Sequence, residues 1–168
     1  MVVLAVAAIL AGVAVPSMAK ILQSVQLSSA SNSFLSSLRL ARSEARKRGS
    51  RVVICKSPDG LSCVADGGWE QGWLVFQDVN GNGHLDVGEA VIQRTDPIGG
   101  GLVFRGNRLV ANSITYVALG GTRGVAGGMQ AGTLTVCRQG DTPGPARQIV
   151  ISSGGRPRVQ QVSQQSCD

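Results

Sequence analysis

Residues 1–48 form one continuous helical pattern, and this pattern constrains the fold more than any other feature of the sequence. The segment 1–15, MVVLAVAAILAGVAV, carries no charge, and the first charged side chain is Lys20. After Pro16, apolar residues recur at steps of three and four as far as Ala45, while serine and glutamine fill much of the other face. One helix over this range would be roughly 70 Å long at about 1.5 Å per residue. A small domain cannot bury that length, so about half of the helix must project into a membrane or a partner.

The apolar run 1–15 is shorter than the roughly 20 residues that a membrane-spanning helix needs. Three interpretations therefore compete: a signal-peptide core, a buried helix, or a membrane span that begins upstream of the printed sequence. No basic residue precedes the run, which argues against a complete signal peptide. Pro16 is expected to kink the helix rather than end it. Gly49 is expected to end it, directly after the cationic Lys47 and Arg48.

Short runs that favour β-strands follow the helix, separated by glycine and proline. They lie at residues 51–55, 73–77, 90–94, 102–106, 114–119, 133–137, 147–152 and 158–162. Strands that follow one helix predict an α+β fold, in which the helix packs on an antiparallel β domain. The glycine-rich stretch 120–132 is expected to be a mobile loop. Only 4% of the residues are aromatic and 23 are glycine, which fits a small β domain better than a large enzyme.

The four cysteines indicate disulfides rather than a metal site. No two of them form a C-x-x-C pair, and the sequence contains one histidine, so the spacing of zinc ligands is missing. An even number of cysteines in a small extracytoplasmic chain predicts two disulfides. Of the three possible connectivities, the local one is the simplest, and it pairs Cys55 with Cys63 and Cys137 with Cys167.

Several segments together resemble the GspH/FimT family of type IV minor pilins and pseudopilins. They are the N-terminal MVVLAVAAILAGVAVPSMAK, the helix end LRLARSEARKRGSRVVIC, the hairpin GWLVFQDVNGNGHLDVGEAVIQ, and the ending LTVC…RQIVISSGGRPRV…C. The resemblance covers nearly the whole chain. It implies a transmembrane or filament-core helix over residues 1–22, an amphipathic helix over 23–50 packed on the domain, and a GspH-like β domain over 51–168.

The resemblance also implies a cellular location and partners. A protein of this family is a single-pass protein of the inner membrane with its domain in the periplasm, and it later joins a pilus with other major and minor pilins. The usual pilin N-terminus continues leftward as a G-F-T-L-I-E-L segment, which holds the prepilin peptidase cleavage site, the start of the methylated mature chain, and a glutamate important for assembly. The printed sequence lacks that segment. We therefore expect the natural start to lie upstream of Met1, with prepilin peptidase as a partner of that longer chain.

Residues 78–89, DVNGNGHLDVGE, fit the EF-hand pattern D-x-[DN]-x-[DN]-G-x5-E. Five side chains would supply oxygen atoms to calcium: Asp78, Asn80, Asn82, Asp86 and Glu89. An EF-hand loop lies between two helices, whereas the flanking runs here are expected to be strands. Asp, Asn and Gly also form hairpin turns. The sequence therefore favours a plain hairpin loop, with calcium, the one cofactor considered, as the alternative.

Two groups of basic residues suggest binding of an anion, in a chain whose net charge is +6. Arg39, Arg42 and Arg46 follow helical spacing and share a face. Together with Lys47, Arg48 and Arg51, they suit a solvated helix end with an ion pair to Glu44 or to the sheet, and an auxiliary contact to DNA or lipid headgroups is the alternative.

The second basic group is Gly155-Arg156-Pro157-Arg158, which lies between two expected strands. Composition alone favours a basic β-turn here. Strand alternation would place both arginines on one side, where guanidinium groups bind phosphates bidentately and Gly155 lets a ligand approach the backbone. A subset of FimT proteins binds DNA during natural transformation through a G-R-x-R motif near the C-terminus, and these four residues match it. The resemblance therefore implies a closest likeness to the DNA-binding FimT type.

The sequence contains no constellation of catalytic groups, so we do not expect an enzyme. The leading hypothesis is a minor pilin that binds double-stranded DNA non-specifically for uptake. The rival hypothesis is a structural tip or priming minor pilin, or a type II secretion pseudopilin, that contacts only other pilins.

Overall fold

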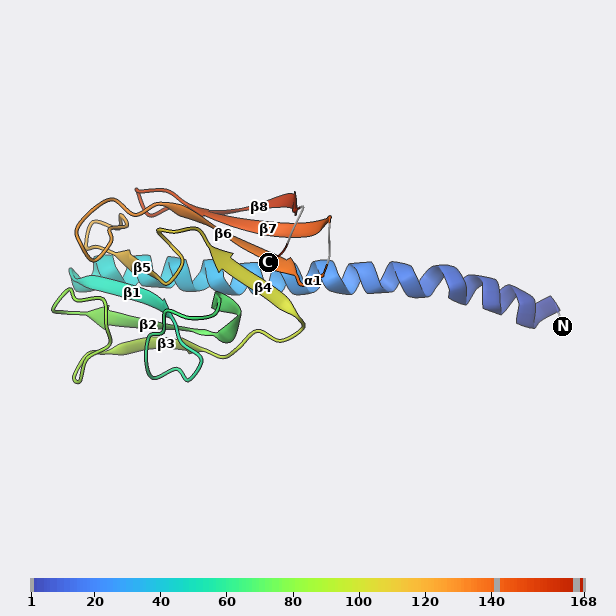
Figure 1. Cartoon of the computed structure of the whole chain (residues 1–168), viewed down its shortest axis with the longest axis horizontal. Helices are drawn as coiled ribbons and strands as arrows, with labels where there is room; N and C mark the ends of the chain where they lie inside the picture. Colours follow the sequence, from blue (N-terminus) through green and yellow to red (C-terminus); the bar gives the residue numbers. More distant parts are fainter. Residues whose placement is uncertain (1, 141–142, 165–166, 168) are drawn as a thin grey trace.

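The computed structural model describes residues 2–140, 143–164 and 167, with the backbone alone described for residues 2–17, 19, 20 and 164. The chain begins as one long helix, and a β domain packs on the C-terminal half of that helix (Figure 1). The elements in chain order are α1 (Val2–Arg48), β1 (Arg51–Lys56), η1 (Trp69–Gln71), β2 (Trp73–Asp78), β3 (Val91–Thr95), β4 (Leu102–Gly106), β5 (Ser113–Tyr116), β6 (Gly132–Arg138), β7 (Gly144–Ile151) and β8 (Pro157–Gln164).

Helix α1 confirms the helix that the apolar spacing predicts. It continues through Pro16 without a break, and Figure 1 shows a gentle bend in its projecting half. It ends at Arg48, where Gly49 has a φ of 61°, a left-handed conformation that glycine adopts at little cost. Most side chains of the predicted membrane segment 1–22 lie outside the described set. Within the described residues, no helix has the length and apolarity that crossing a membrane requires.

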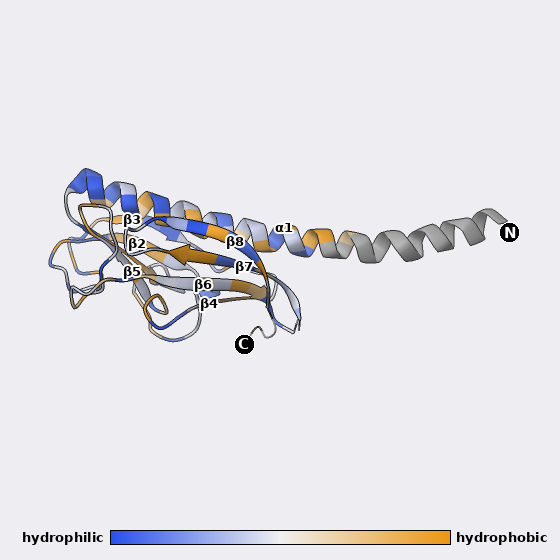
Figure 2. Ribbon diagram, turned by 90° about the horizontal axis from the view of Figure 1, so that it is seen from above, coloured by the Kyte–Doolittle hydropathy of each residue, from blue (hydrophilic) through white to orange (hydrophobic). Residues whose placement is uncertain are grey.

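One stripe of α1 faces the β domain, within the segment 23–50 that the sequence predicts to pack there. Val25 is 57% exposed, whereas the stripe that begins two residues later is buried. Its apolar members are Leu27, Ala30, Phe34, Leu38, Ala41 and Ala45. Figure 2 shows the helix lying along one side of the domain, with hydrophilic residues gathered at its C-terminal end. Burial of this stripe, rather than helix propensity alone, stabilises the packed half of α1.

Phe34 lies at the centre of the main core. Its ring meets Trp69 of η1, Trp73 of β2 and Phe104 of β4, each edge-on with ring centroids 4.9 to 5.0 Å apart. Edge-to-face contacts of this kind add about 0.5–1.5 kcal/mol each beyond the area that they bury. The indole N–H of Trp73 also donates to the hydroxyl of Ser37 at 3.0 Å. Phe34 therefore ties the helix to strands of both sheets.

The strands pair antiparallel, as predicted, but they form two sheets. In the described residues the orders are β3-β2-β1-β5 and β4-β6-β7-β8, so β8 is an edge strand. Strand β5 stops at Tyr116, three residues before the predicted end at 119, because the chain turns back directly after it. The N–H of Gly120 donates to the carbonyl of Val117 at 2.7 Å and closes that turn. This turn brings Gly120 next to the C-terminal half of α1.

Both disulfides join the local pairs that the sequence predicts. Cys55 of β1 is bonded to Cys63 in the following loop, and Cys137 of β6 is bonded to Cys167 after β8. The second bond closes a loop across 30 positions and holds Cys167 beside Val103, Cys137 and Ala146 on the outer face of the sheet. In the chain-entropy model a loop of this length stabilises the fold by roughly 3–4 kcal/mol.

Candidate functional site

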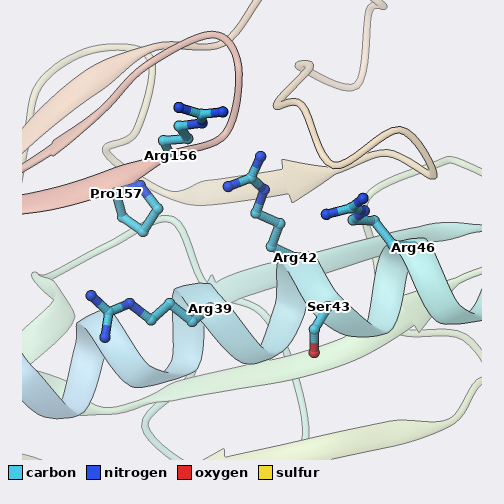
Figure 3. A pocket seen from close by; sticks show the side chains of 6 residues that line it. All are labelled: Arg39, Arg42, Ser43, Arg46, Arg156 and Pro157. Carbon is cyan, nitrogen blue, oxygen red and sulfur yellow. The ribbon is translucent and has the colours of Figure 1, made fainter.

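A hollow of about 340 Å³ lies where the C-terminal half of α1 meets the turn between β7 and β8 (Figure 3). Its lining is dominated by arginine and consists of Arg39, Arg42, Ser43, Arg46, Arg156 and Pro157. We call this group the arginine hollow. None of the residues that line it is acidic. Figure 3 shows the guanidinium groups of Arg156 and Arg42 reaching into the same space from the turn and from the helix. The tertiary structure thus joins the two basic groups that the sequence analysis found separately.

Helical spacing positions the arginines of α1 beside the buried stripe. Arg39 and Arg46 are exposed, while Arg42, between them, is half-buried. The ion pair with Glu44 predicted for the basic helix end is confirmed, since Glu44 contacts Lys47 at 3.8 Å and Arg48 at 2.6 Å. The hydrogen bond from Arg48 lowers the pKa of Glu44. Glu44 therefore pairs with cations outside the arginine hollow, and α1 places no carboxylate among the residues that line it.

Arg42 connects the helix to two turns of the β domain. Its Nε donates to the carbonyl oxygen of Gly120 at 2.9 Å, and its Nη2 donates to that of Gly154 at 3.2 Å. A hydrogen bond from a charged donor contributes about 1.5–3 kcal/mol when it is shielded from water. The bond to Gly120 is only part-buried and the bond to Gly154 is exposed, so we expect about 1–3 kcal/mol from the two together. Arg42 thus has a structural task that Arg39 and Arg46 lack, although spacing alone makes the three residues equivalent.

Gly155 is required by the packing of the protein itself, rather than by the approach of a ligand. It is buried and has a φ of 70°, which favours glycine. A Cβ atom at this position would lie 2.2 Å from the carbonyl oxygen of Gly120 and 3.0 Å from Cε1 of Tyr116. The neighbouring Gly154 differs, because its Cβ would meet nothing nearer than the Ser152 Oγ at 3.8 Å. The glycine of the G-R-x-R motif therefore allows the β7–β8 turn to pack closely against the turn that follows β5.

The two motif arginines lie on different sides of the β domain, which corrects the expectation from alternation. Arg156 precedes β8 and lines the arginine hollow, and its backbone N–H donates to the Ser152 hydroxyl at 3.3 Å. Strand β8 begins at Pro157, and Val159 packs against the main core. Because side chains alternate along a strand, Arg158 faces away from the helix, where it is exposed opposite Val150. The simple alternation failed because a turn, and not a strand, holds Arg156.

The loop 78–89 connects two strands, β2 and β3, as the hairpin interpretation predicts. The side-chain oxygen atoms that would bind calcium instead accept hydrogen bonds from other groups of the loop. Asp78 is buried and accepts from the backbone N–H groups of Gly81 at 2.7 Å and Gly83 at 3.1 Å. The side chains of Asn80 and Asn82 donate to Asp86, and Glu89 accepts two backbone N–H groups, from Val79 and Asp86. In the described part of the chain, no three Asp, Glu, His or Cys residues are grouped so as to hold a metal ion.

Comparison with known proteins relates this geometry to a family. The sequence profile described as type II transport protein GspH matches residues 30–155.

The chain belongs to the GspH family.

Solved structures show the same fold. The type IV minor pilin FimU of Pseudomonas aeruginosa is 24% identical, with a TM-score of 0.62 over 84% of this chain and 95% of that chain. A second crystal form of FimU is 25% identical, with a TM-score of 0.60 over 84% of this chain and 100% of that chain. The minor pseudopilin EpsH of the Vibrio cholerae type II secretion system is 15% identical, with a TM-score of 0.55 over 80% of this chain and 96% of that chain. A search of curated proteins found no match.

As a GspH-family protein, this chain is a minor pilin or pseudopilin of a type IV pilus or a type II secretion system, and it is not an enzyme. The family also implies an inner-membrane anchor, a domain in the periplasm, and other pilins and the pilus machinery as partners.

Sequence reasoning singled out Arg42 but missed its structural role, and it missed Arg147 altogether. Arg42 is distinguished only by its bonds to Gly120 and Gly154, which are 78 and 112 positions away. Arg147 of β7 shares a face with the buried Ile149 and Ile151, and it is itself only 9% exposed. The available signal for Arg147 was an arginine on the same strand face as Ile149 and Ile151.

Proposed function

We propose that this chain is a minor pilin of the DNA-binding FimT type, and that its arginine hollow binds double-stranded DNA non-specifically for uptake. The observation that carries the proposal is that Arg39, Arg46 and Arg156 line one hollow, and that no residue lining it is acidic. Guanidinium groups bind phosphate oxygens bidentately, and several of them on one surface supply the electrostatic attraction of non-specific DNA binding.

The arginines around the hollow have different roles, which supports a surface arranged for binding rather than an accidental cluster of charges. Arg42 contacts the carbonyls of Gly120 and Gly154 and so holds the β7–β8 turn against the helix, which positions Arg156. Arg39 and Arg46 remain exposed on either side of Arg42. We assign phosphate contacts to Arg39, Arg46 and Arg156, and a positioning role to Arg42. Arg158, exposed on the edge strand β8 and facing away from the helix, lies outside this hollow, so we assign it no contact to the DNA bound there.

The test is a titration of labelled double-stranded DNA, monitored by fluorescence anisotropy, with the purified chain in detergent. We expect a Kd in the micromolar range at low salt, in keeping with non-specific binding. Replacing Arg156 and Arg39 together by alanine should weaken binding equally for unrelated DNA sequences, because phosphate contacts carry no base information. The slope of log K against log salt should fall by up to ~2, since each phosphate that the protein no longer neutralises lowers it by about 0.9.

Arg108 supplies a matched control, because it is also exposed but does not line the arginine hollow. The Arg108→Ala chain should bind DNA with nearly unchanged affinity and salt slope. Equal losses in Arg108→Ala and Arg156→Ala would show that only net charge matters, and the assignment of the site would be wrong. An Arg158→Ala chain that loses more affinity than Arg156→Ala would move the main contact to the outer face of β8.

The second candidate function is a structural minor pilin or type II secretion pseudopilin that contacts only other pilins. It is favoured by the exposed apolar side chains on the projecting helix, which are Met18, Ile21, Leu22 and Val25. In this function residues 1–22 lie in the membrane or the filament core. A wild-type chain that binds no DNA, or loss of pili in cells that carry Arg156→Ala and Arg158→Ala, would favour this candidate.

A further inference from the structure

We propose that a second hollow, built around Arg147, binds the carboxylate of an aspartate or glutamate side chain from a neighbouring pilin subunit. This inference rests on membership of the pilin family and is independent of DNA binding. The hollow has a volume of about 240 Å³ and lies between α1 and the β7–β8 pair. We call it the Arg147 hollow, and it is lined by Ser28, Ser31, Asn32, Arg147 and residues 159–161.

Arg147 is a buried cation with most of its donors unused. It is 9% exposed, and Nη2 donates to the Ser28 hydroxyl at 3.1 Å. A guanidinium group carries five N–H donors, and this is the one hydrogen bond that its side chain makes to described residues. The ion pairs among the described residues involve Lys47, Arg48 and Arg105, and none of them involves Arg147. The side chain lines the hollow, so a carboxylate that entered would meet a cation that is largely shielded by protein and has N–H donors left free by the described residues.

The walls of the Arg147 hollow suit a single carboxylate. Ser28 and Asn32 lie one helical turn apart on α1, and Gln160 and Gln161 line the opposite side, so neutral donors surround one cation. A planar carboxylate matches the fork of a guanidinium group. Duplex DNA is a wide, rigid cylinder that needs several exposed cations, and one recessed arginine does not provide them. A carboxylate on a flexible side chain can enter the hollow.

The position of the hollow points to another subunit as the source of this side chain. Figure 1 shows α1 projecting from one end of the β domain. Ser28 and Asn32 lie just after Leu27, where the buried stripe of α1 begins, so these two lining residues place the hollow near that end. The exposed Asn32, Gln160 and Gln161 surround its mouth. A subunit that packs along the projecting helix would reach this end of the domain.

The first experiment uses the full chain in detergent and a capped glutamate, N-acetyl-glutamate methylamide, as the probe. The Nε–H resonance of Arg147 and the backbone N–H resonance of Gln161 should shift in a saturable way with a Kd in the millimolar range, whereas capped glutamine should have no effect; the Gln161 resonance also reports binding in variants that lack Arg147. Arg147→Lys should weaken binding at least tenfold, while Arg158→Lys, at an exposed arginine, should leave it unchanged. The absence of a saturable shift in the wild-type chain would overturn the site.

A second variant tests the site without removing a buried residue. Asn32→Asp places a carboxylate at the mouth, where it should pair with Arg147, raise the melting temperature and weaken capped glutamate binding at least tenfold. Adding Arg147→Gln to this variant should remove the gain in melting temperature. Unchanged melting and binding in Asn32→Asp would contradict the geometry.

The source of the carboxylate is tested in cells by immunoblotting sheared pili. Arg147→Gln and Asn32→Asp should each lower incorporation of this chain at least tenfold, whereas Arg158→Gln should not. Normal incorporation together with capped glutamate binding would assign the hollow to a small carboxylate and overturn the neighbouring subunit as its source. Arg147→Gln should keep its DNA affinity within twofold, so failure of this inference and failure of the DNA proposal are distinguishable.

Discussion

Replacing Gly155 by alanine tests the contact that positions the motif arginine. Gly155 has a φ of 70°, and the new Cβ would lie 2.2 Å from the backbone oxygen of Gly120. A left-handed backbone costs about 1–2 kcal/mol for an L-residue. The overlap must also push the two turns apart and weaken one or both hydrogen bonds from Arg42, at about 1–2 kcal/mol. We expect a total loss of about 2–4 kcal/mol, which corresponds to a fall in melting temperature of roughly 4–16 °C for a domain of this size.

The assay is thermal unfolding followed by circular dichroism, with Gly154→Ala as the matched control. Gly154 is outside the left-handed region, and its Cβ would have an open environment. This control should be neutral or more stable by up to about 1 kcal/mol, because alanine restricts the unfolded chain. Gly155→Ala should also weaken DNA binding through displacement of Arg156. Equal melting temperatures for the two variants would refute the close approach of Gly155 to Gly120.

Three further measurements test the surrounding structure. Arg42→Ala should destabilise the domain by about 1–3 kcal/mol in calorimetry, because both turns lose a donor, whereas Arg39→Ala should change it by less than about 0.5 kcal/mol. The pKa of Asp59 is lowered to about 2, because backbone N–H groups two and three residues later donate to its carboxylate. Its contribution to stability is therefore present above its usual pKa of 3.8 and disappears as the pH falls toward about 2. An Asp59→Asn chain should show a weaker fall in melting temperature between pH 4 and pH 2, and equal pH profiles would contradict this assignment. Millimolar calcium should leave the melting temperature unchanged, since the oxygens of the β2–β3 loop already accept internal hydrogen bonds, and a clear rise would support the calcium alternative.

The local pattern of apolar and turn-forming residues was sufficient to predict much of the fold. The three-to-four spacing of apolar residues predicted α1 through Pro16 to Gly49, because such a stripe is stable only as a helix packed on one side. The strands were predicted for a similar reason, since their β-branched runs are bounded by glycine and proline. The local disulfides were the simplest of three possible connectivities, and the structure confirms both pairs, at separations of 8 and 30 positions. These features depend on residues that are close in sequence, so the sequence by itself determined them.

The arrangement of the arginines was decided by contacts between distant segments. Helical spacing gives Arg39, Arg42 and Arg46 equivalent positions. Only the hydrogen bonds to the turns at Gly120 and Gly154 give Arg42 a structural role that the other two lack. Alternation predicts one side for Arg156 and Arg158 only if a single strand holds both, whereas β8 begins between them. The burial of Arg147 similarly needs α1 to lie across β7. In each case the role of a side chain depends on which remote backbone lies within hydrogen-bonding distance, and that distance exists only after the two sheets have packed around the helix.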